Sequence, residues 1–436
     1  METLFKVSAG IDVHKDTVVV SIRERDDRER EKVETRTFET FHDTVVQMVA
    51  WLDEHEVEVV GLESTGVYWK PVVRALKVGS PCRLVWLVNP AEVKKVPGRK
   101  TDVNDSQWLS KLVMHGLVSP SFLPPLEQEE LRKLTRFRTR LVAEQTSIKN
   151  RILKEMEATG IKLASVCSDP LGKSGRAMLD ALLAGTQTPA QIAQLALGTL
   201  RTKIPTLERA VCGSFSEATR FVLKQMVAHL DQIQRDMKAL DEQIQMRLAG
   251  YEKEADLLQP MPGLDRVAIA AVLAEIGGDM SVFRGADPLA AWSGLCPGSN
   301  ESAGKSKSAP TRKGDKYLRT ILVQVAWSAV RTRGCFWKQK FGQLVKRLGP
   351  KKAIVAIARK MLVAIYYMLR DRVPYQQPTA PVPSNAKAKR MVQQYTARLV
   401  ALGFEVHLTP VVAPAEPTPV ASRTTEAPAP VAAPAT

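Results

Sequence analysis

The stretch KVSAGIDVHKDTVVVSI, residues 6–22, is the part of the chain that decides the predicted fold. Its apolar residues form two runs separated by polar residues, so we predict strands at Lys6–Val13 and Thr17–Arg23. A third run at Lys32–Phe38 follows closely, as expected for an antiparallel meander of three strands. A single acid, Asp12, interrupts the first apolar run.

Beyond these strands, helix and strand patterns alternate. An amphipathic helix around Val45–Leu52 precedes a strand at Val57–Leu62, and a helix around Tyr68–Leu76 precedes a strand at Cys82–Val88. A last helix is expected from about Val103 to His115. Three strands followed by helix, strand, helix, strand and helix is the order of a ribonuclease-H-like α/β fold.

After Pro124-Pro125 the pattern becomes helical over long distances. One apolar seam consists of Leu131, Leu134, Leu141, Ile148 and Ile152. A second keeps a 3-4 spacing through Leu223, Met226, Leu230, Ile233, Met237, Leu240 and Ile244. The two seams predict a coiled-coil hairpin or a coiled-coil contact between two chains, and two helices of an ordinary bundle explain the spacing equally well.

We therefore divide the chain into four parts. The ribonuclease-H-like domain spans 1–124, a coiled-coil or helical linker 125–252, a helical C-terminal domain 253–374, and a mostly flexible Pro/Ala-rich tail 375–436. Within the tail, residues 387–408 have helix-then-strand character.

The C-terminal domain opens on a turn that has two interpretations. Pro262-Gly263-Leu264 resembles the turn of a helix-hairpin-helix, which offers backbone N–H groups to a phosphate. The alternative is a tight turn between packed helices.

The charge of the chain is unusually positive. Over 436 residues, 62 Lys and Arg against 46 Asp and Glu leave a formal net charge of +16 and a pI near 9.6. Such a chain attracts polyanions, and nucleic acid is the leading candidate because neutralising its phosphates releases counterions. A ribosome-associated or membrane-surface protein is the alternative that composition leaves open.

Cysteine and histidine usage predicts neither a zinc site nor a disulfide framework. The five cysteines lie far apart with no Cys-x-x-Cys pair, and the six histidines are scattered. The N-terminal residues lack the apolar core of a signal peptide, and Arg359 and Lys360 interrupt the most apolar late stretch, Ala353–Leu369. We expect a soluble protein of a reducing cytoplasm.

Four carboxylates occupy positions that the predicted fold would bring to one edge of the sheet. Asp12 interrupts a strand, Glu63 ends the run EVVGLE, and Asp102 and Asp105 lie at the start of the last helix in RKTDVNDSQWL. Each acid taken alone is better explained as a structural or capping residue. Together they suit Mg²⁺, which takes oxygen ligands and can act on phosphodiesters in pairs.

A polar segment of the C-terminal domain, AAWSGLCPGSNESAGKSKSAPTRKGDKYLR, combines small residues with cations. Gly298 and Gly304 enclose five residues where a Walker A loop needs four, so nucleotide binding is excluded. Ser302 lies among small neighbours, but no nearby His would activate it. The cations that we expect to contact a nucleic-acid backbone are Lys305, Lys307, Arg312, Lys313, Lys316 and Arg319.

Four of these segments, taken together, resemble one known family. They are GIDVHKD around Asp12, LESTGVYWKP around Glu63, KTDVNDSQWL around Asp102 and Asp105, and GLCPGSNESAGKSKSAPTRKGDKYLR around Ser302. Their order and spacing are similar to those of the DEDD transposases of the insertion-sequence-110 family, and the ESAGK form is typical of its insertion-sequence-1111 branch. The resemblance covers roughly residues 6–369.

The resemblance implies both an activity and its residues. Asp12, Glu63, Asp102 and Asp105 would bind Mg²⁺, or Mn²⁺ in its place, in a RuvC-like nuclease domain. Ser302 of a helical transposase domain would attack DNA and form a covalent phosphoserine link.

It also implies partners: DNA of the element ends and the target, a structured guide RNA, and homodimers that assemble into a tetramer on DNA in a bacterial or archaeal cytoplasm. RNA pairing would leave mainly phosphate contacts to the protein. One basic stretch is a candidate for these phosphate contacts, and a solvated helix face explains it equally well. It consists of Arg132, Lys133, Arg136, Arg138 and Arg140.

One residue departs from the pattern of many relatives, which carry two adjacent serines where Glu301 and Ser302 stand here. The ESAGK form is itself common, so Ser302 remains the expected nucleophile, with Ser299 and Ser306 as weaker candidates. A metal-only RuvC-like nuclease or junction resolvase is the main alternative function and would not need Ser302. A basic architectural protein is the non-enzymatic alternative.

Overall fold

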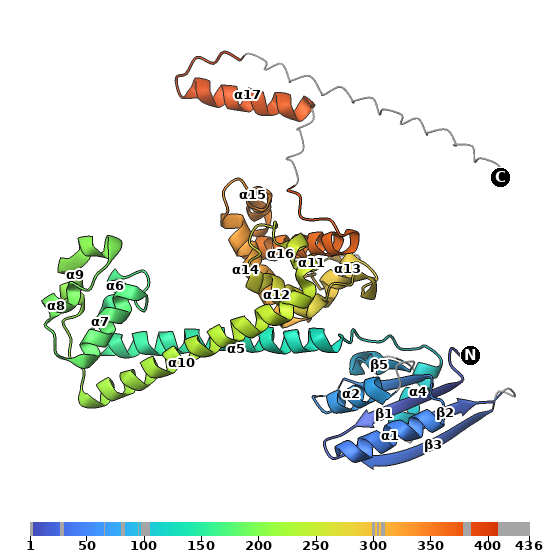
Figure 1. Ribbon diagram of the computed structural model, residues 1–436. Helices are drawn as coiled ribbons and strands as arrows, with labels where there is room; N and C mark the ends of the chain where they lie inside the picture. Colours follow the sequence, from blue (N-terminus) through green and yellow to red (C-terminus); the bar gives the residue numbers. More distant parts are fainter. Residues whose placement is uncertain are drawn as a thin grey trace, which may run out of the picture. The chain divides into compact units, whose positions relative to one another are not determined.

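The computed structural model describes residues 3–26, 30–64, 66–79, 83–94, 96, 105–298, 301–302, 305–306, 310–377 and 385–408. They belong to two units, Met1–Gln377 and Pro378–Thr436, each of which is described by itself (Figure 1).

The N-terminal domain is built on a five-stranded sheet of order β3-β2-β1-β4-β5 (Figure 1). β1 (Val7–Val13), β2 (Thr17–Arg25) and β3 (Glu31–Glu39) form an antiparallel meander. β4 (Val59–Glu63) pairs in parallel with β1, and β5 (Leu84–Val88) in parallel with β4. This order and these directions are those of the ribonuclease-H-like fold, so the predicted fold class is confirmed.

Helices cover both faces of this sheet. α1 (His42–Glu54) and α2 (Trp69–Gly79) share one apolar core with the buried Ile11 and Leu62. α4 (Asp105–Met114) packs on the opposite face, against Val59 and Val88 among others.

The observed bounds differ from the predicted ones by a few residues. β4 starts two residues later than predicted, and α1 and α2 extend beyond the apolar residues that predicted them. A short helix that the sequence did not predict, α3 (Pro90–Val93), follows β5. Cys82 and the start of the predicted helix at residues 103–104 lie outside the described residues.

The two long helices pack against each other within one chain. Ion pairs join α5 (Leu126–Ala158) to α10 (Glu217–Leu248) by linking Glu130 to Arg247 and Arg138 to Asp241, and a hydrogen bond links Glu144 to His229. Because later residues of α5 pair with earlier residues of α10, the helices are antiparallel. We call this pair the helical hairpin, one of the arrangements that the apolar seams predicted.

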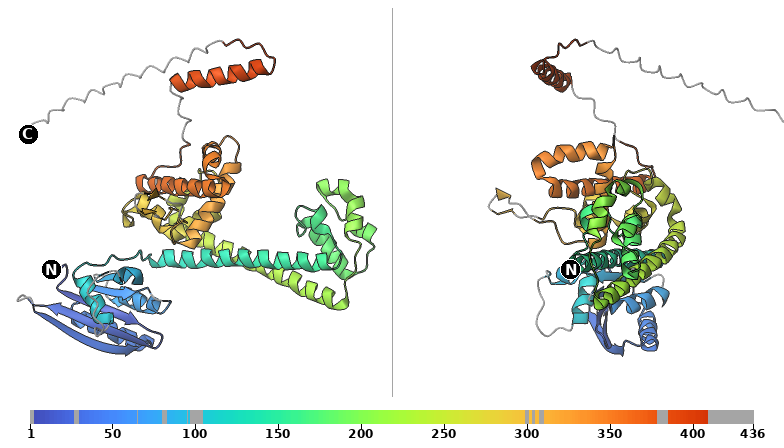
Figure 2. Two further views of the ribbon diagram at one scale, coloured as in Figure 1. Left: turned by 180° about the vertical axis from the view of Figure 1, so that it is seen from behind. Right: turned by 90° about the vertical axis from the view of Figure 1, so that its left-hand side faces the viewer.

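The connection between α5 and α10 is itself a small helical cluster, the hairpin insert (residues 161–211, Figure 2). Its core includes Ile161, Met178, Leu207 and residues of both long helices. Its elements are α6 (Leu163–Val166), α7 (Lys173–Ala184), α8 (Pro189–Ala193), η1 (Gly198–Lys203) and α9 (Ile204–Ala210).

The helical C-terminal part of this unit shares its core with the base of the helical hairpin, where Leu131 and Ile244 are buried. Its elements are η2 (Ala249–Tyr251), α11 (Glu252–Leu258), α12 (Arg266–Ile276), η3 (Met280–Val282), α13 (Ala286–Trp292), α14 (Lys316–Arg331), α15 (Phe336–Leu348) and α16 (Pro350–Asp371).

The Pro262-Gly263-Leu264 turn between α11 and α12 lies against α14. A Cβ on Gly263, whose φ is +90°, would stand 2.5 Å from the carbonyl oxygen of Val325. The packed backbone leaves no room there for a phosphate on that side, which favours the tight-turn interpretation.

The second unit contains α17 (Asn385–Ala401), which fits the predicted helical character. The prediction of a strand after this helix is wrong, because residues 404–408, which the structure describes, form no strand. None of the helices described in either unit is long and apolar enough to cross a membrane.

Candidate active site and nucleic-acid interface

Two of the expected metal-binding acids lie on the face of the sheet that α4 covers. Ser8 donates a hydrogen bond to the carbonyl oxygen of Ser110 in α4 (3.1 Å), and a Cβ on Gly10 would clash with the same helix. Side chains alternate along a strand, so Asp12, two residues further on, belongs to this face. Gly61 faces Val113 of α4. By the same alternation, Glu63, two residues further along the chain, belongs to the face that α4 covers.

The direction of α4 brings its first residue, Asp105, to the same end of the sheet. Ser106 Oγ lies 2.7 Å from Ser21 Oγ, Ser110 lies over Ser8, and Met114 O accepts a hydrogen bond from Leu4 N (2.9 Å). The helix therefore runs antiparallel to β1 and begins near the carboxyl ends of β1 and β4.

The side chain of Asp12 is 27% exposed, and its Oδ2 lies 3.1 Å from Nε2 of His14, a contact that the sequence did not predict. Asp102, the fourth expected ligand, lies outside the described residues. Among the residues that are described, no group of three or more His, Cys, Asp or Glu is close enough to hold a metal ion. The carboxylate oxygens of Asp12, Glu63 and Asp105 are nevertheless of the donor type that a hard cation prefers.

The segment that contains Ser302 is closed at its base by backbone hydrogen bonds. Gly298 N donates to Pro310 O (2.8 Å), Arg312 N to Cys296 O (3.0 Å) and Asp315 N to Trp292 O (3.1 Å). We call residues 296–298 and 310–315 the serine stem.

Beyond the stem, β6 (Glu301–Ser302) pairs antiparallel with β7 (Lys305–Ser306), and Ser302 is opposite Lys305. The backbone of Ser302 therefore lies at the closing pair of a small hairpin. The side chains of residues 301–309 lie outside what the structure describes, as do Ser299 and Lys307 entirely.

Two glycines allow the base of the stem to close. Gly294 has a φ of +71°, which side chains disfavour, and a Cβ on Gly314 would stand only 2.3 Å from Gly294 N. Backbone meets backbone here, so the orientation of the stem is fixed by main-chain packing. Of the expected phosphate contacts in this region, Arg312, Lys313 and Lys316 are exposed and Arg319 is half-buried.

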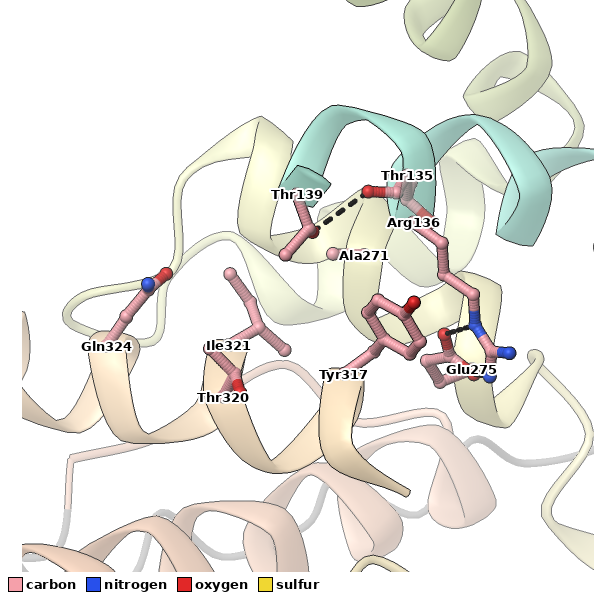
Figure 3. Close-up of a pocket in the computed structure, with 9 residues that line it drawn as sticks. All are labelled: Thr135, Arg136, Thr139, Ala271, Glu275, Tyr317, Thr320, Ile321 and Gln324. Carbon is pink, nitrogen blue, oxygen red and sulfur yellow. Dashed lines mark hydrogen bonds and ion pairs between the residues drawn. The ribbon is translucent and has the colours of Figure 1, made fainter. Parts of the chain in front are cut away.

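The basic stretch of α5 divides into residues that have protein partners and residues that are exposed. Arg136 makes two hydrogen bonds of 2.7 Å to the Glu275 carboxylate (Figure 3). Arg132 Nε lies 3.1 Å from the same carboxylate. Arg138 pairs with Asp241. These three guanidinium groups therefore have intramolecular functions, whereas Lys133 and Arg140 are exposed on the same helix.

A larger basic surface was missed by the sequence analysis, although the sequence carries its signal. From residue 316 to residue 370, through α14, α15 and almost all of α16, the chain contains no Asp or Glu. It contains instead thirteen cations: Lys316, Arg319, Arg331, Arg333, Lys338, Lys340, Lys346, Arg347, Lys351, Lys352, Arg359, Lys360 and Arg370. Arg359 pairs with Asp287 and Arg370 with Asp371, but most of the thirteen cations are exposed, and exposed cations attract a phosphate backbone.

Two protein-family models match separate parts of this chain. A model for DEDD transposases of the IS110 type, described as transposase, matches residues 9–160. A second, described as transposase of the IS116/IS110/IS902 family, matches residues 255–341.

Individual relatives carry related descriptions. The probable family 20 transposase of Pseudomonas aeruginosa is 25% identical over 277 residues, which are 63% of this chain and 71% of that protein. The transposase for insertion sequence element IS1111A of Coxiella burnetii is 23% identical over 298 residues, 66% of this chain and 72% of that protein. The pilin gene-inverting protein of Moraxella bovis is 32% identical over 127 residues, 28% of this chain and 39% of that protein.

Among solved structures, a Thermus thermophilus RuvC structure matches 26% of this chain and 99% of that chain, with 14% identity and a TM-score of 0.21. The assignment rests instead on the two family models, which together span more than half of the chain and contain both the acids and the serine segment. The chain belongs to the IS110 family of transposases.

Proposed function

We propose that this transposase cuts and rejoins DNA strands with Ser302 as the nucleophile, on a metal platform formed by Asp12, Glu63, Asp102 and Asp105. The observation that carries the proposal is the convergence of Asp12, Glu63 and the start of α4 at one end of one sheet face. Ser302 also lies in a closed hairpin rather than in an extended linker, which supports its proposed role as a nucleophile that is held toward the DNA.

The proposed step is a transesterification. Ser302 Oγ forms a bond to the phosphorus of a DNA phosphodiester, the bond from phosphorus to the leaving deoxyribose oxygen breaks, and the serine proton passes to solvent while the leaving oxygen takes up a proton. The DNA phosphodiester is exchanged for a phosphoserine ester without hydrolysis. The number of phosphate ester bonds is unchanged, and the DNA strand can therefore be rejoined without an external energy source. The reverse attack by a DNA hydroxyl releases Ser302.

The four acids would hold divalent cations such as Mg²⁺, or Mn²⁺. When bound, the cation lowers the negative charge on the phosphate and on the attacking and leaving oxygens. The acids themselves contribute by holding their oxygens at a fixed end of a rigid sheet. Asp105 gains further support because the N-terminus of α4 favours negative charge.

Nucleic acid would contact the exposed cations of residues 316–370 together with Lys133 and Arg140. Phosphate contacts position a strand but read no sequence. We therefore include a structured guide RNA among the proposed partners, beside element and target DNA. We also include assembly of homodimers into a tetramer, in which one copy supplies the acids and another the serine.

The test is to trap the covalent adduct. The full-length protein, its flanking-encoded RNA, junction DNA and Mg²⁺ are mixed, denatured and separated by electrophoresis. We expect a protein–DNA band that Ser302→Ala, Asp105→Asn and a chelator each abolish, and that Ser299→Ala, the matched control, retains. Cleavage that survives Ser302→Ala without an adduct would show a metal-only nuclease. An adduct that Ser299→Ala removes would assign the nucleophile to Ser299.

A metal-binding measurement separates the acids from the serine. Titration of the DNA-free protein with Mn²⁺, followed by electron paramagnetic resonance, should show binding that Asp12→Asn weakens and Ser302→Ala leaves unchanged. Equal binding by the wild type and Asp12→Asn would contradict the platform.

A further inference from the structure

One guanidinium group joins the helical hairpin to the base of the serine stem. Arg136 of α5 donates two hydrogen bonds to Glu275 at the end of α12, and its Nη2 also donates to Asp315 Oδ2 (2.8 Å). The Tyr317 ring centroid lies 4.6 Å from the guanidinium carbon, so a cation–π contact gives Arg136 a third neighbour (Figure 3).

Asp315 is the residue through which this contact reaches the serine segment. It is the last residue of the stem, and its N–H closes the stem on Trp292 O. Its Oδ1 caps α14 by accepting hydrogen bonds from Tyr317 N and Leu318 N, both at 2.8 Å. The two carboxylate oxygens therefore have separate partners: Oδ1 holds the start of α14, and Oδ2 holds α5.

The two carboxylates that Arg136 binds, Glu275 and Asp315, are largely removed from solvent. The Glu275 side chain is 2% exposed and that of Asp315 11%. Burial raises the pKa of the Glu275 carboxyl, and the hydrogen bond from Arg136 and the charge of Arg132 oppose that rise. A buried carboxylate without a cation is strongly destabilising, so Arg136 and Arg132 stabilise the fold by remaining paired with Glu275.

We propose that Arg136 is a positioning residue for the Ser302 segment. By holding Asp315, it ties the serine stem to α5, so that the position of the helical hairpin is transmitted to the nucleophile. This inference rests on the proposed function for the role of Ser302, but the tie between Arg136 and the stem does not.

The separate roles of the Asp315 oxygens allow a precise test. Asp315→Asn keeps a carbonyl oxygen to cap α14 but presents an N–H₂ group, which cannot accept a hydrogen bond, to Arg136. Arg136→Met removes the guanidinium at similar length. Arg136→Lys keeps the charge, but one ammonium cannot replace the planar fork that serves both carboxylates. The matched control is Arg138→Met. Arg138 lies on α5, like Arg136, and its substitution breaks the pair with Asp241 of α10.

The full-length protein with its RNA and junction DNA would be assayed for the single-turnover rate of adduct formation. Hydrogen exchange of the Gly298, Arg312 and Asp315 amides would be measured in parallel by mass spectrometry. We expect Arg136→Met and Asp315→Asn to slow adduct formation by about tenfold or more, the size of one charge-assisted hydrogen bond. The double variant should be no slower than the worse single one.

Exchange at the stem amides should rise in both variants, while the amides of Leu362 and Ile365 in the core of α16 stay protected. Arg136→Lys should lie between the wild type and Arg136→Met, and Arg138→Met should match the wild type. A wild-type rate and wild-type stem exchange in Arg136→Met would overturn the proposal. So would equal loss of protection in the stem and α16, because that would show general destabilisation. If the wild type forms no adduct, the proposed function fails, and the stem exchange still decides whether Arg136 holds the stem.

Discussion

At the scale of single residues, two glycines on the central strands set the height of α4 above the sheet. A Cβ on Gly10 would stand 2.0 Å from Ser106 O and 2.4 Å from Ser110 N, both backbone atoms of α4. A Cβ on Gly61 would meet the side-chain methyl Val113 Cγ2 at 2.3 Å. Backbone cannot move aside as a methyl can, so Gly10 is the stricter requirement. It also stands two residues before Asp12.

We therefore predict that Gly10→Ala displaces α4, and Asp105 with it, whereas Gly61→Ala mainly rotates a side chain. Overpacking of this kind costs about 1–3 kcal/mol, and Gly10→Ala should lie at the upper end. Urea unfolding measures the free energy, and Mn²⁺ titration measures the acid site. Larger destabilisation by Gly61→Ala, or unchanged Mn²⁺ affinity in Gly10→Ala, would contradict this account.

The sequence predicted the placement of Asp12 and Glu63 in the sheet better than it predicted the partners of the arginines. Asp12 and Glu63 were recognisable because a carboxylate inside or at the end of an apolar strand is unusual, and strand order then fixes which end of the sheet they share. The partner of Arg136 was not recognisable, because Glu275 is 139 residues away and looks like one acid of an ordinary helix. Local patterns mark a cation, but only tertiary packing decides whether it faces solvent or a buried carboxylate.

At the scale of elements, the absence of Asp and Glu from residues 316–370 of α14–α16 has a measurable electrostatic consequence. Each cation that neutralises a phosphate contributes about 0.9 to the slope of log affinity against log salt for duplex DNA. We predict that Lys346→Gln and Arg347→Gln, in the last turn of α15, each weaken DNA binding and reduce this slope by about 0.9 if the side chain contacts a phosphate.

Lys253→Gln is the control for this measurement, because Lys253 is exposed among Glu252, Glu254 and Asp256 on α11. Fluorescence anisotropy at several salt concentrations, with the same sequence as DNA duplex and as RNA, gives the slopes. An equal change of slope in Lys253→Gln would mean that net charge, rather than this surface, governs binding.

The seams of α5 and α10 show a limit of pattern reasoning at the same scale. Heptad spacing predicted two long helices, but it left open whether they pair with each other or with another chain. The answer lies in ion pairs such as Arg138–Asp241 and in the hairpin insert that reverses the chain, neither of which repeats with the heptad.

An ion pair between the hairpin insert and α10 predicts how the insert responds to acid. Arg176 of α7 binds Asp231 of α10 through two hydrogen bonds, of 2.6 and 2.8 Å. The hydrogen bonds and charge of Arg176 hold the pKa of Asp231 below its ordinary value of 3.8. The resulting stabilisation is present above that value and is lost as the pH falls through the lower folded-state pKa.

We predict that acidification below about pH 4 loosens the insert and that Asp231→Asn removes this pH dependence. Cys167, buried in the insert core, reports the opening when it reacts with an aromatic disulfide reagent that works in acid, and the exposed Cys212 is the internal reference. Identical acid profiles for the wild type and Asp231→Asn would show that the pair does not stabilise the insert.

At the scale of the whole molecule, the boundary at Gln377 separates the unit that contains the hydrophobic cores described above from the segment that follows it. Tyr375, just before the boundary, packs against the core of the helical C-terminal part. The Tyr375 ring stacks on Trp337 at 6.4 Å between centroids, its N–H donates to Leu257 O, and burial raises the pKa of its hydroxyl to about 12. Gln377 adds a hydrogen bond to Gly334 O.

We therefore predict different outcomes for two truncations only five residues apart. A chain that ends after Gln377 should unfold with the free energy of the full chain, because it keeps every contact of Tyr375. A chain that ends after Arg372 should lose about 1.5–3 kcal/mol, the value of burying one large side chain, and expose Trp337. Urea unfolding followed by tryptophan fluorescence measures both. Equal loss in both truncations would mean that residues 378–436 stabilise the first unit, and that the boundary at Gln377 does not separate two independent units.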